Sequence, residues 1–300
     1  MEMLHYDFMQ RAFYAGGLIA LVASVLGVYL MLRRQALMAD MLSHVSLAGI
    51  AGGAYLQMNP TISGFLIAVL GAFIVEFVRK FYKAYSEISI AIIMVGGLSS
   101  AVIIMSLDQK ISKSFSSYLF GSVVAVNSTE LFLMLFVAVV GGLYFFVFRR
   151  PLYLITFDEE TARTSGLPVN LISYSFSVLT GMIVAAAMPI VGVLLVSALI
   201  VLPAALAIRI APGFQSALVI AMIIGLSGVF TGLTASYEFS TPPGGTIAFV
   251  LLLFLITGIS VKKLIRMLSK SLTSKSVPEA GPIRAYVSAR TQEVRETAER

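Results

Sequence analysis

The chain has 300 residues, of which 58% are hydrophobic and 12% are charged, and its mean hydropathy is +0.94. A soluble globular domain carries about a quarter charged residues, so this composition excludes such a domain and indicates a protein embedded in lipid. The net charge of +6 does not indicate a nucleic-acid partner, because the basic residues gather at the ends of apolar segments. The absence of cysteine excludes disulfides, thiolate metal sites and thiol nucleophiles.

Nine apolar segments follow one another along the chain. Each is much longer than a barrel strand, and lipid requires an internally hydrogen-bonded backbone. We therefore predict an all-α, polytopic transmembrane helical bundle with eight or nine spans. In the eight-span alternative the second segment, which is the least hydrophobic, is partly re-entrant. The segments are residues 12–32, 41–58, 62–78, 88–107, 131–148, 171–188, 191–210, 214–233 and 244–261.

The lysines and arginines predict the orientation of the chain in the membrane. Residues 12–32 lack a convincing signal-peptide cleavage site, so we interpret them as the first span. With nine spans and the C-terminus inside, 18 of the 21 basic residues lie in inner segments. Only Arg11, Lys110 and Lys113 then lie outside, in agreement with the positive-inside rule. We expect a multi-pass protein with an outer N-terminus and a cytoplasmic C-terminus.

Three segments are too polar to span the membrane. Residues 108–130 form an outer connection in which the Tyr118–Gly121 stretch favours a short interfacial helix. Residues 149–170 form the longest inner connection. We divide the chain into a transmembrane domain, residues 1–265, and a polar cytoplasmic tail, residues 266–300, which we expect to be solvated and partly helical or disordered.

Ionisable residues inside the spans are costly, so each one is a functional candidate. The second segment contains Asp40 and His44, the third contains Glu76, and Glu87 and Glu130 lie at span edges. An i, i+4 spacing places Asp40 and His44 on one helix face, with their Cβ atoms about 5–6 Å apart. At about 1.5 Å per residue, His44 lies roughly 15 Å beyond Arg34, which is near the membrane midplane.

A carboxylate and an imidazole suit zinc or manganese, and transporters often bind substrate at mid-membrane depth. Three alternatives stay open for Asp40 and His44: an internal salt bridge, hydrogen bonding between helices, and a proton relay. Two ligands are also too few for a closed metal site. The small residues that follow, Ala48 to Gly53, indicate close helix packing or a narrow pathway.

The inner connection contains a predicted short helix. Residues 158–164 (DEETART) are followed by Ser165-Gly166-Leu167-Pro168, in which glycine and proline are helix-stop signals. A compact helix on the cytoplasmic face suits docking to another protein, and a plain connecting turn is the alternative.

Three stretches together resemble the membrane subunits of bacterial ABC importers for zinc and manganese. They are LRRQALMADMLSHVSLAGIAGG, FDEETARTSGLPVN and PIVGVLLVSALIVLPAALAIRIA, and the resemblance covers most of residues 8–265. It implies a homodimeric permease in the cytoplasmic membrane, two cytoplasmic ATPase subunits, an extracellular metal-binding lipoprotein, and alternating access driven by ATP. In addition to lipid, these are the expected partners.

The resemblance also assigns roles to residues. It implies that Asp40 and His44 contact the metal in transit, and that residues 157–167 form the helix that seats in the ATPase. No cofactor is expected to be permanently bound, and the transported ion is Zn²⁺ or, next, Mn²⁺, because YDFMQRAF and SHVSLAG are similar to zinc permeases of Gram-positive bacteria. The sequence departs from many members at Ala39, where they have glycine. The expected docking residues are Asp158, Glu159, Glu160, Ala162 and Gly166.

Other function classes account for less of the sequence. The chain contains no GxxxxGK[ST] sequence, so a partner must hydrolyse the ATP, and no enzyme activity is expected of this subunit. A self-sufficient, proton-coupled metal transporter is the main alternative, but it should contain more intramembrane acids. A membrane metalloprotease lacks its HExxH sequence here, and a scaffold protein leaves Asp40 and His44 unexplained.

Overall fold

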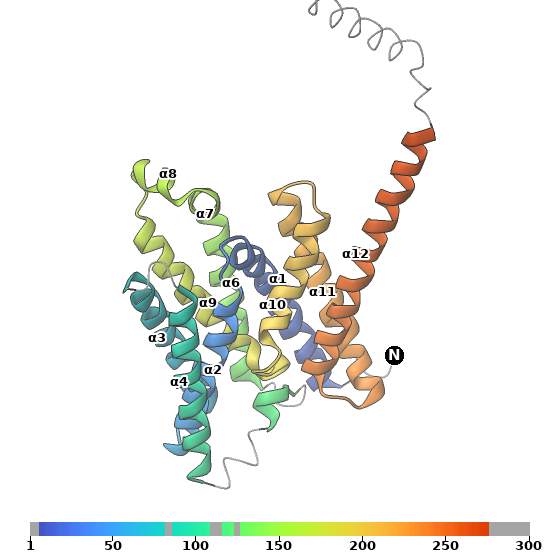
Figure 1. The fold of residues 1–300 in the computed structure, drawn as a ribbon. Coiled ribbons are helices and arrows are strands. Elements are labelled where there is room, and N and C mark those ends of the chain that lie inside the picture. The colour runs from blue at the N-terminus through green and yellow to red at the C-terminus, as the bar shows by residue number, and fades with distance from the viewer. Residues whose placement is uncertain (1–5, 82–85, 109–115, 123–126, 276–300) are drawn as a thin grey trace, which may run out of the picture. The chain divides into compact units, whose positions relative to one another are not determined.

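The computed structural model describes residues 6–81, 86–108, 116–122 and 127–275, and the described residues form helices without any strand (Figure 1). The all-α prediction is confirmed. Each of the nine predicted segments coincides with a helix. In chain order these are α1 (Asp7–Leu32), α2 (Leu37–Tyr55), α3 (Pro60–Phe81), α4 (Ser86–Ser106), α6 (Ser128–Val147), α9 (Val169–Val191), α10 (Val196–Ile210), α11 (Phe214–Phe239) and α12 (Pro243–Lys275).

Eight of these helices are long and apolar enough to cross a membrane, and α10, with 15 residues, is the shorter one. The second segment, expected to be the weak span, is a complete helix of 19 residues. Most of α2 is buried against protein, so it does not need the apolar surface that lipid requires. The eight-span alternative, in which the second segment is partly re-entrant, is therefore wrong about that segment. The shorter helix is α10.

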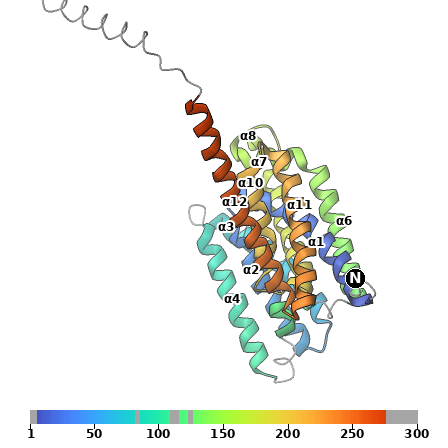
Figure 2. The ribbon, with the colours of Figure 1, turned by 90° about the vertical axis from the view of Figure 1, so that its right-hand side faces the viewer.

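The described chain divides into two compact units at the boundary between Ile256 and Thr257. In the first unit, α2 packs on α3 and α4, while α1 packs on α6, α10 and α11. Figure 2 shows α1 and α11 side by side. Apolar side chains on the outer face of α4, such as Ile92, Val95 and Ile103, are exposed, as expected of a lipid-facing helix. The second unit contains the end of α12, which stays helical to Lys275, and the predicted tail beyond it, residues 276–300, lies outside the described residues.

Contacts between residues 116–122 and residues 189–194 explain why α10 is short. Residues 116–120 are helical, as expected of the outer connection, and they lie against the break between α9 and α10. The amide of Val193 donates to the Tyr118 carbonyl at 2.9 Å, and the amide of Ser122 donates to the Pro189 carbonyl at 3.0 Å.

Two glycines make these contacts possible. Gly121 (φ +76°) and Gly192 (φ +82°) have left-handed backbones, and a Cβ on either would overlap the opposing backbone. Residues 192–195 therefore replace the first helical turn of this span.

The end of the bundle opposite to the start of α1 carries two short helices, α7 (Arg149–Phe157) and α8 (Glu159–Thr164) (Figure 1). Leu152 and Ile155 of α7 are buried, so this helix is anchored by its apolar face. At the same end, the buried Tyr29 ring stacks on Phe145 with a centroid separation of 5.5 Å and meets Phe214 edge-on at 5.4 Å. This packing supports the platform from which α8 projects.

Candidate functional site

Helix α2 carries both residues of the predicted metal pair. Asp40 lies in its first turn and His44 lies one turn further along the same face. The partial positive charge at a helix N-terminus favours a carboxylate at the position of Asp40. The helix has no side-chain cap at its start, because its N-cap position is Ala36.

A single stripe of partly exposed residues runs along α2. Between Met38 and Gly53, every residue is buried except Asp40, His44, Ala48 and Gly52, which are spaced four residues apart. We refer to these four residues as the open stripe. The helix therefore presents one narrow face that begins with a carboxylate and an imidazole and continues over two small residues.

The glycines of α2 separate into two groups according to what surrounds them. A Cβ on Gly49 would lie 2.6 Å from the Cβ of Ile67 on α3, and a Cβ on Gly53 would overlap the side chain of Ser63. A Cβ on Gly52 would meet nothing within 4 Å. Both interpretations of the small-residue run are therefore correct, but for different residues: Gly49 and Gly53 allow close packing, and Gly52 keeps one face open.

The polar atoms of the open stripe lack partners within the described part of the chain. The Nδ1 atom of His44 is buried and makes no hydrogen bond there. The Asp40 carboxylate makes no hydrogen bond or ion pair among the same residues, so the predicted alternative of an Asp40–His44 salt bridge is not formed. Since a buried polar atom without a partner is costly, the pair is suited to bind a ligand from outside the chain.

One chain does not supply a complete metal site. Among the described residues, no group of three or more histidine, aspartate or glutamate side chains is arranged to hold a metal ion. Asp40 and His44 offer one oxygen and one nitrogen donor, whereas zinc sites usually have four ligands. Any ion bound at the open stripe needs donors from water or from another chain.

The other intramembrane acids have different surroundings. Glu130 is buried at the start of α6, where Asn127 and Glu130 form a capping box, and the Thr61 hydroxyl donates to Glu130 at 3.1 Å. Glu130 therefore caps the start of α6 and also contacts α3 through Thr61. Glu87 is exposed in the first turn of α4. Glu76 is buried inside α3 and is not a cap, since Arg79 and Ser177 both donate to its carboxylate at 2.9 Å.

The predicted docking helix is present as α8. Asp158 is its N-cap and accepts from the Thr161 amide at 2.9 Å, and Glu159 pairs with Arg163 at 3.0 Å. Hydrogen bonds from the Thr161 hydroxyl and amide hold the pKa of the Asp158 carboxyl below its usual value. Gly166 ends the helix with φ +80°, as its position after the helix predicts.

The five predicted docking residues differ in exposure. Asp158, Glu159, Glu160 and Gly166 are exposed and can face a partner. Ala162 is fully buried, so it attaches α8 to the bundle. The two sets predicted from sequence, on α2 and on α8, are separate in the fold, with α8 at one end of the bundle (Figure 1).

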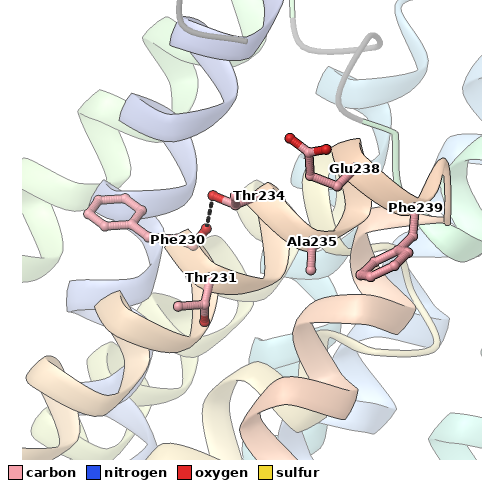
Figure 3. Close-up of a pocket in the computed structure, with 6 residues that line it drawn as sticks. All are labelled: Phe230, Thr231, Thr234, Ala235, Glu238 and Phe239. Carbon is pink, nitrogen blue, oxygen red and sulfur yellow. Dashed lines mark hydrogen bonds between the residues drawn. The ribbon is translucent and has the colours of Figure 1, made fainter. Parts of the chain in front are cut away.

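A pocket on α11 offers no second candidate metal site. Figure 3 shows that Glu238 is its only ionisable lining residue, and the Thr234 hydroxyl is bonded to its own helix at the Phe230 carbonyl, 2.8 Å away. A single carboxylate beside apolar side chains is not a ligand set for a metal. The lining residues are Phe230, Thr231, Thr234, Ala235, Glu238 and Phe239.

Sequence reasoning missed the role of the basic residues at the α8 end. Arg33 and Arg79 were counted only as inner charges that orient the chain. In the structure Arg33 donates to the Ser173 hydroxyl at 3.1 Å and stacks over Phe176 at 4.8 Å, and Arg79 pairs with Glu76. Burial and the nearby Arg79 lower the pKa of Arg33. The i, i+3 spacing of Glu76 and Arg79 was the signal in the sequence.

Comparison with known proteins gives a consistent result. Residues 5–262 match the model of the ABC 3 transport family. The chain is 36% identical over 261 residues to "Probable metal transport system membrane protein" of Treponema pallidum, covering 86% of this chain and 97% of the relative. It is 27% identical to "Manganese transport system membrane protein MntC" of Halalkalibacterium halodurans, covering 83% and 85%.

The fold also matches a solved structure, "PsaBC from Streptococcus pneumoniae in complex with Fab". The TM-score is 0.77 at 27% identity, and the match covers 86% of this chain and 92% of that chain.

Proposed function

Because this chain belongs to the ABC 3 transport family, we propose that it is the permease of an ATP-driven importer that moves divalent transition-metal ions across the bacterial cytoplasmic membrane. Its relatives are named for metal and manganese transport, which supports the class of cargo. The chain itself is not an enzyme, and ATP is hydrolysed on separate ATPase subunits.

The observation that carries this proposal is the open stripe of α2. His44 presents a buried ring nitrogen without a partner among the described residues, and Asp40 presents a carboxylate one helical turn away. These donors suit an ion that accepts both oxygen and nitrogen ligands, such as Zn²⁺ or Mn²⁺. Ala48 and Gly52 leave room for the ion to continue along the same face.

The cargo requires a choice between two ions. The sequence prediction of zinc rests on resemblance in two short stretches, whereas the names of relatives such as MntC favour manganese. The Asp–His donor pair accepts both ions. We propose that both compete for the same pair, so excess unlabelled Zn²⁺ should inhibit Mn²⁺ uptake through wild-type protein.

Two copies of the permease complete the site. Each copy contributes Asp40 and His44, so two open stripes that face one pathway supply four donors, which is the usual number for zinc. This arrangement resolves the shortage of ligands within one chain. It also gives the partly exposed face of α2 a partner.

Helix α8 is the proposed contact with the ATPase. Its exposed acidic residues, Glu159 and Glu160, lie at the opposite end of the bundle from the start of α1 (Figure 1). We place this end in the cytoplasm, with two ATPase subunits below two permease copies. A metal-binding lipoprotein then delivers the ion at the other side.

The decisive experiment is uptake of ⁵⁴Mn²⁺ and, separately, ⁶⁵Zn²⁺ into proteoliposomes that contain the permease and its ATPase. Wild-type uptake should require ATP. Asp40→Asn and His44→Ala should abolish uptake while the complex still assembles, because they remove the only donors on the open stripe. The control is Asp7→Asn, which changes an exposed aspartate in the first turn of α1, outside both the open stripe and the proposed docking helix.

Two results would contradict the proposal. Full uptake by both Asp40→Asn and His44→Ala would show that Asp40 and His44 do not bind the transported metal. Uptake by the isolated permease on a proton gradient without ATP would establish the proton-coupled alternative instead.

A further inference from the structure

Among the residues that the structure describes, Glu76 is the one buried acid that neither a helix cap nor the open stripe explains. Its side chain lies inside the α3 span and is 8% exposed. The Oε2 atom of Glu76 accepts from Arg79 Nη1 and from the Ser177 hydroxyl, both at 2.9 Å. Glu76 therefore joins α3 to α9.

Arg79 extends this contact to the turn before α2. In the amide orientation that satisfies both side chains, the Gln35 oxygen lies 2.8 Å from Arg79 Nη2 and 3.1 Å from Nη1. Gln35 is also buried. The chain of contacts thus runs from Ser177 through Glu76 and Arg79 to Gln35, which lies five residues before Asp40.

The turn that Gln35 occupies is strained. Arg34 has φ +56°, a left-handed conformation that is unfavourable for a residue with a side chain. The turn is stabilised from both sides: the Gln35 amide donates to the Leu30 carbonyl at 2.8 Å, and Arg33 donates to Ser173 on α9. Since strained backbone persists only where its surroundings determine it, these contacts set the position of the turn.

The start of α2 has no side-chain cap, as is also true of α1, α7, α9 and α10, so contacts from outside the helix must position it. Helices α6 and α8 begin with side-chain caps at Asn127 and Asp158, whereas α2 begins at Ala36 without one. The Gln35–Arg79 contact therefore fixes the end of α2 from which Asp40 and His44 project. The other side of the network, Ser173 and Ser177, lies in the first turns of α9, directly after α8.

We propose that Glu76 is a positioning residue for metal transfer: through Arg79 and Gln35 it fixes the first turn of α2, and through Ser177 it links that turn to the helix that follows the docking helix. This inference rests on the proposed function, in which Asp40 and His44 bind the ion. Glu76 touches neither residue and acts through the turn. An apolar contact of equal size would hold the helices without burying charge, so the ionic network specifies a position rather than only adding stability.

The test measures transport per ATP in the reconstituted permease–ATPase complex, with ⁵⁴Mn²⁺ and ⁶⁵Zn²⁺ supplied separately. Residues that orient a metal ligand typically change metal binding or activity by about 10–100-fold. We expect Glu76→Gln to lower the ions transported per ATP hydrolysed by about 10-fold, and Glu76→Asp to restore part of this loss. Glu130→Gln is the matched control, because it neutralises a buried glutamate that caps α6 and accepts from Thr61 but has no part in the Ser177–Glu76–Arg79–Gln35 network.

Glu76→Gln removes the carboxylate that pairs with the buried end of Arg79 and can prevent folding, so two further variants that change no charge accompany it. Ser177→Ala removes the α9 contact, and Gln35→Met removes the acceptor of Arg79 at similar volume. Each should lower ions per ATP without an equal fall in melting temperature. Their combined effect should be smaller than the product of the single effects, because both act through one network.

The outcomes separate this inference from the proposed function. If Asp40→Asn and His44→Ala abolish uptake but all network variants transport as many ions per ATP as wild type, the positioning role is wrong and the metal site stands. If the network variants lose uptake only in proportion to melting temperature, Glu76 is merely structural. If Asp40→Asn and His44→Ala keep full uptake, both proposals fail.

Discussion

The two faces of α2 have opposite surroundings. One face, which includes Val45, Gly49 and Gly53, is closed: α3 approaches so nearly that an added carbon on either glycine would collide with it, and α4 packs against Val45. The other face is the open stripe, whose donors and small residues meet little of their own chain. The same composition of small residues thus serves packing on one side and access on the other.

This difference separates the two usual meanings of small residues in a membrane helix. Small residues at a helix interface let backbones approach closely, and substitution there creates steric conflict. Small residues on an open face leave space for something else, and substitution there leaves the fold intact. Gly52 on the open face and Gly53 on the closed face are adjacent in sequence. The same substitution at these two positions therefore distinguishes a packing role from an access role.

The largest expected effect is on the closed face. Gly53→Val should strongly reduce the melting temperature of the purified permease, because the new side chain overlaps Ser63 of α3, and overpacking costs roughly 1–3 kcal/mol or more. Gly52→Val is the matched control, with the same change one residue away, and should leave the melting temperature close to that of wild type. Equal losses at both positions would show that the two faces do not differ.

Much of this arrangement follows from the sequence alone. Long apolar runs predict helices because lipid leaves the backbone few other options, and all nine runs are helices in the structure. The i, i+4 spacing of Asp40 and His44 correctly placed them on one face of one helix. The helix-stop signals after Thr164 correctly predicted where α8 ends.

What the sequence did not predict depends on contacts between distant segments. The short α10 results from residues 116–122 bonding to residues 189–194, and no local pattern encodes that pairing. The sequence gives no basis for distinguishing Gly52 from Gly53. The structure distinguishes them because Ser63 of α3 lies against Gly53 and not against Gly52. Likewise, the sequence predicts that Arg79 is only a membrane-flanking charge. The structure shows that it contacts both Gln35 and Glu76.

A smaller effect is expected from added bulk on the open stripe. Ala48→Leu should reduce metal uptake in the reconstituted complex, because the larger side chain narrows the proposed pathway one turn beyond His44. The melting temperature should change little, since Ala48 is partly exposed. Ala91→Leu provides the control, as it makes the same change on an exposed position of α4. Normal uptake by Ala48→Leu would argue that the ion does not pass along this stripe.

The smallest expected effect concerns a carboxylate with the opposite surroundings to Asp40. Asp158 is exposed, and its partners lie in its own helix, so it should stabilise only the first turn of α8. Its pKa is lowered in the folded protein, so its stabilisation is present above the usual aspartate pKa of about 3.9 and is lost as the pH falls below that value.

Amide hydrogen exchange of residues 159–162, corrected for intrinsic rates, measures this turn in the intact protein. At pH 7, Asp158→Ala should accelerate exchange there and leave the melting temperature of the bundle unchanged, because only one exposed cap is lost. As the pH falls below the lowered pKa of Asp158, exchange in wild type and variant should converge, since protonation removes the negative charge that Asp158→Ala also removes. A lower melting temperature of the whole bundle in Asp158→Ala would contradict this prediction. It would mean that Asp158, like the buried residues and unlike an ordinary exposed cap, contributes to the stability of the bundle itself.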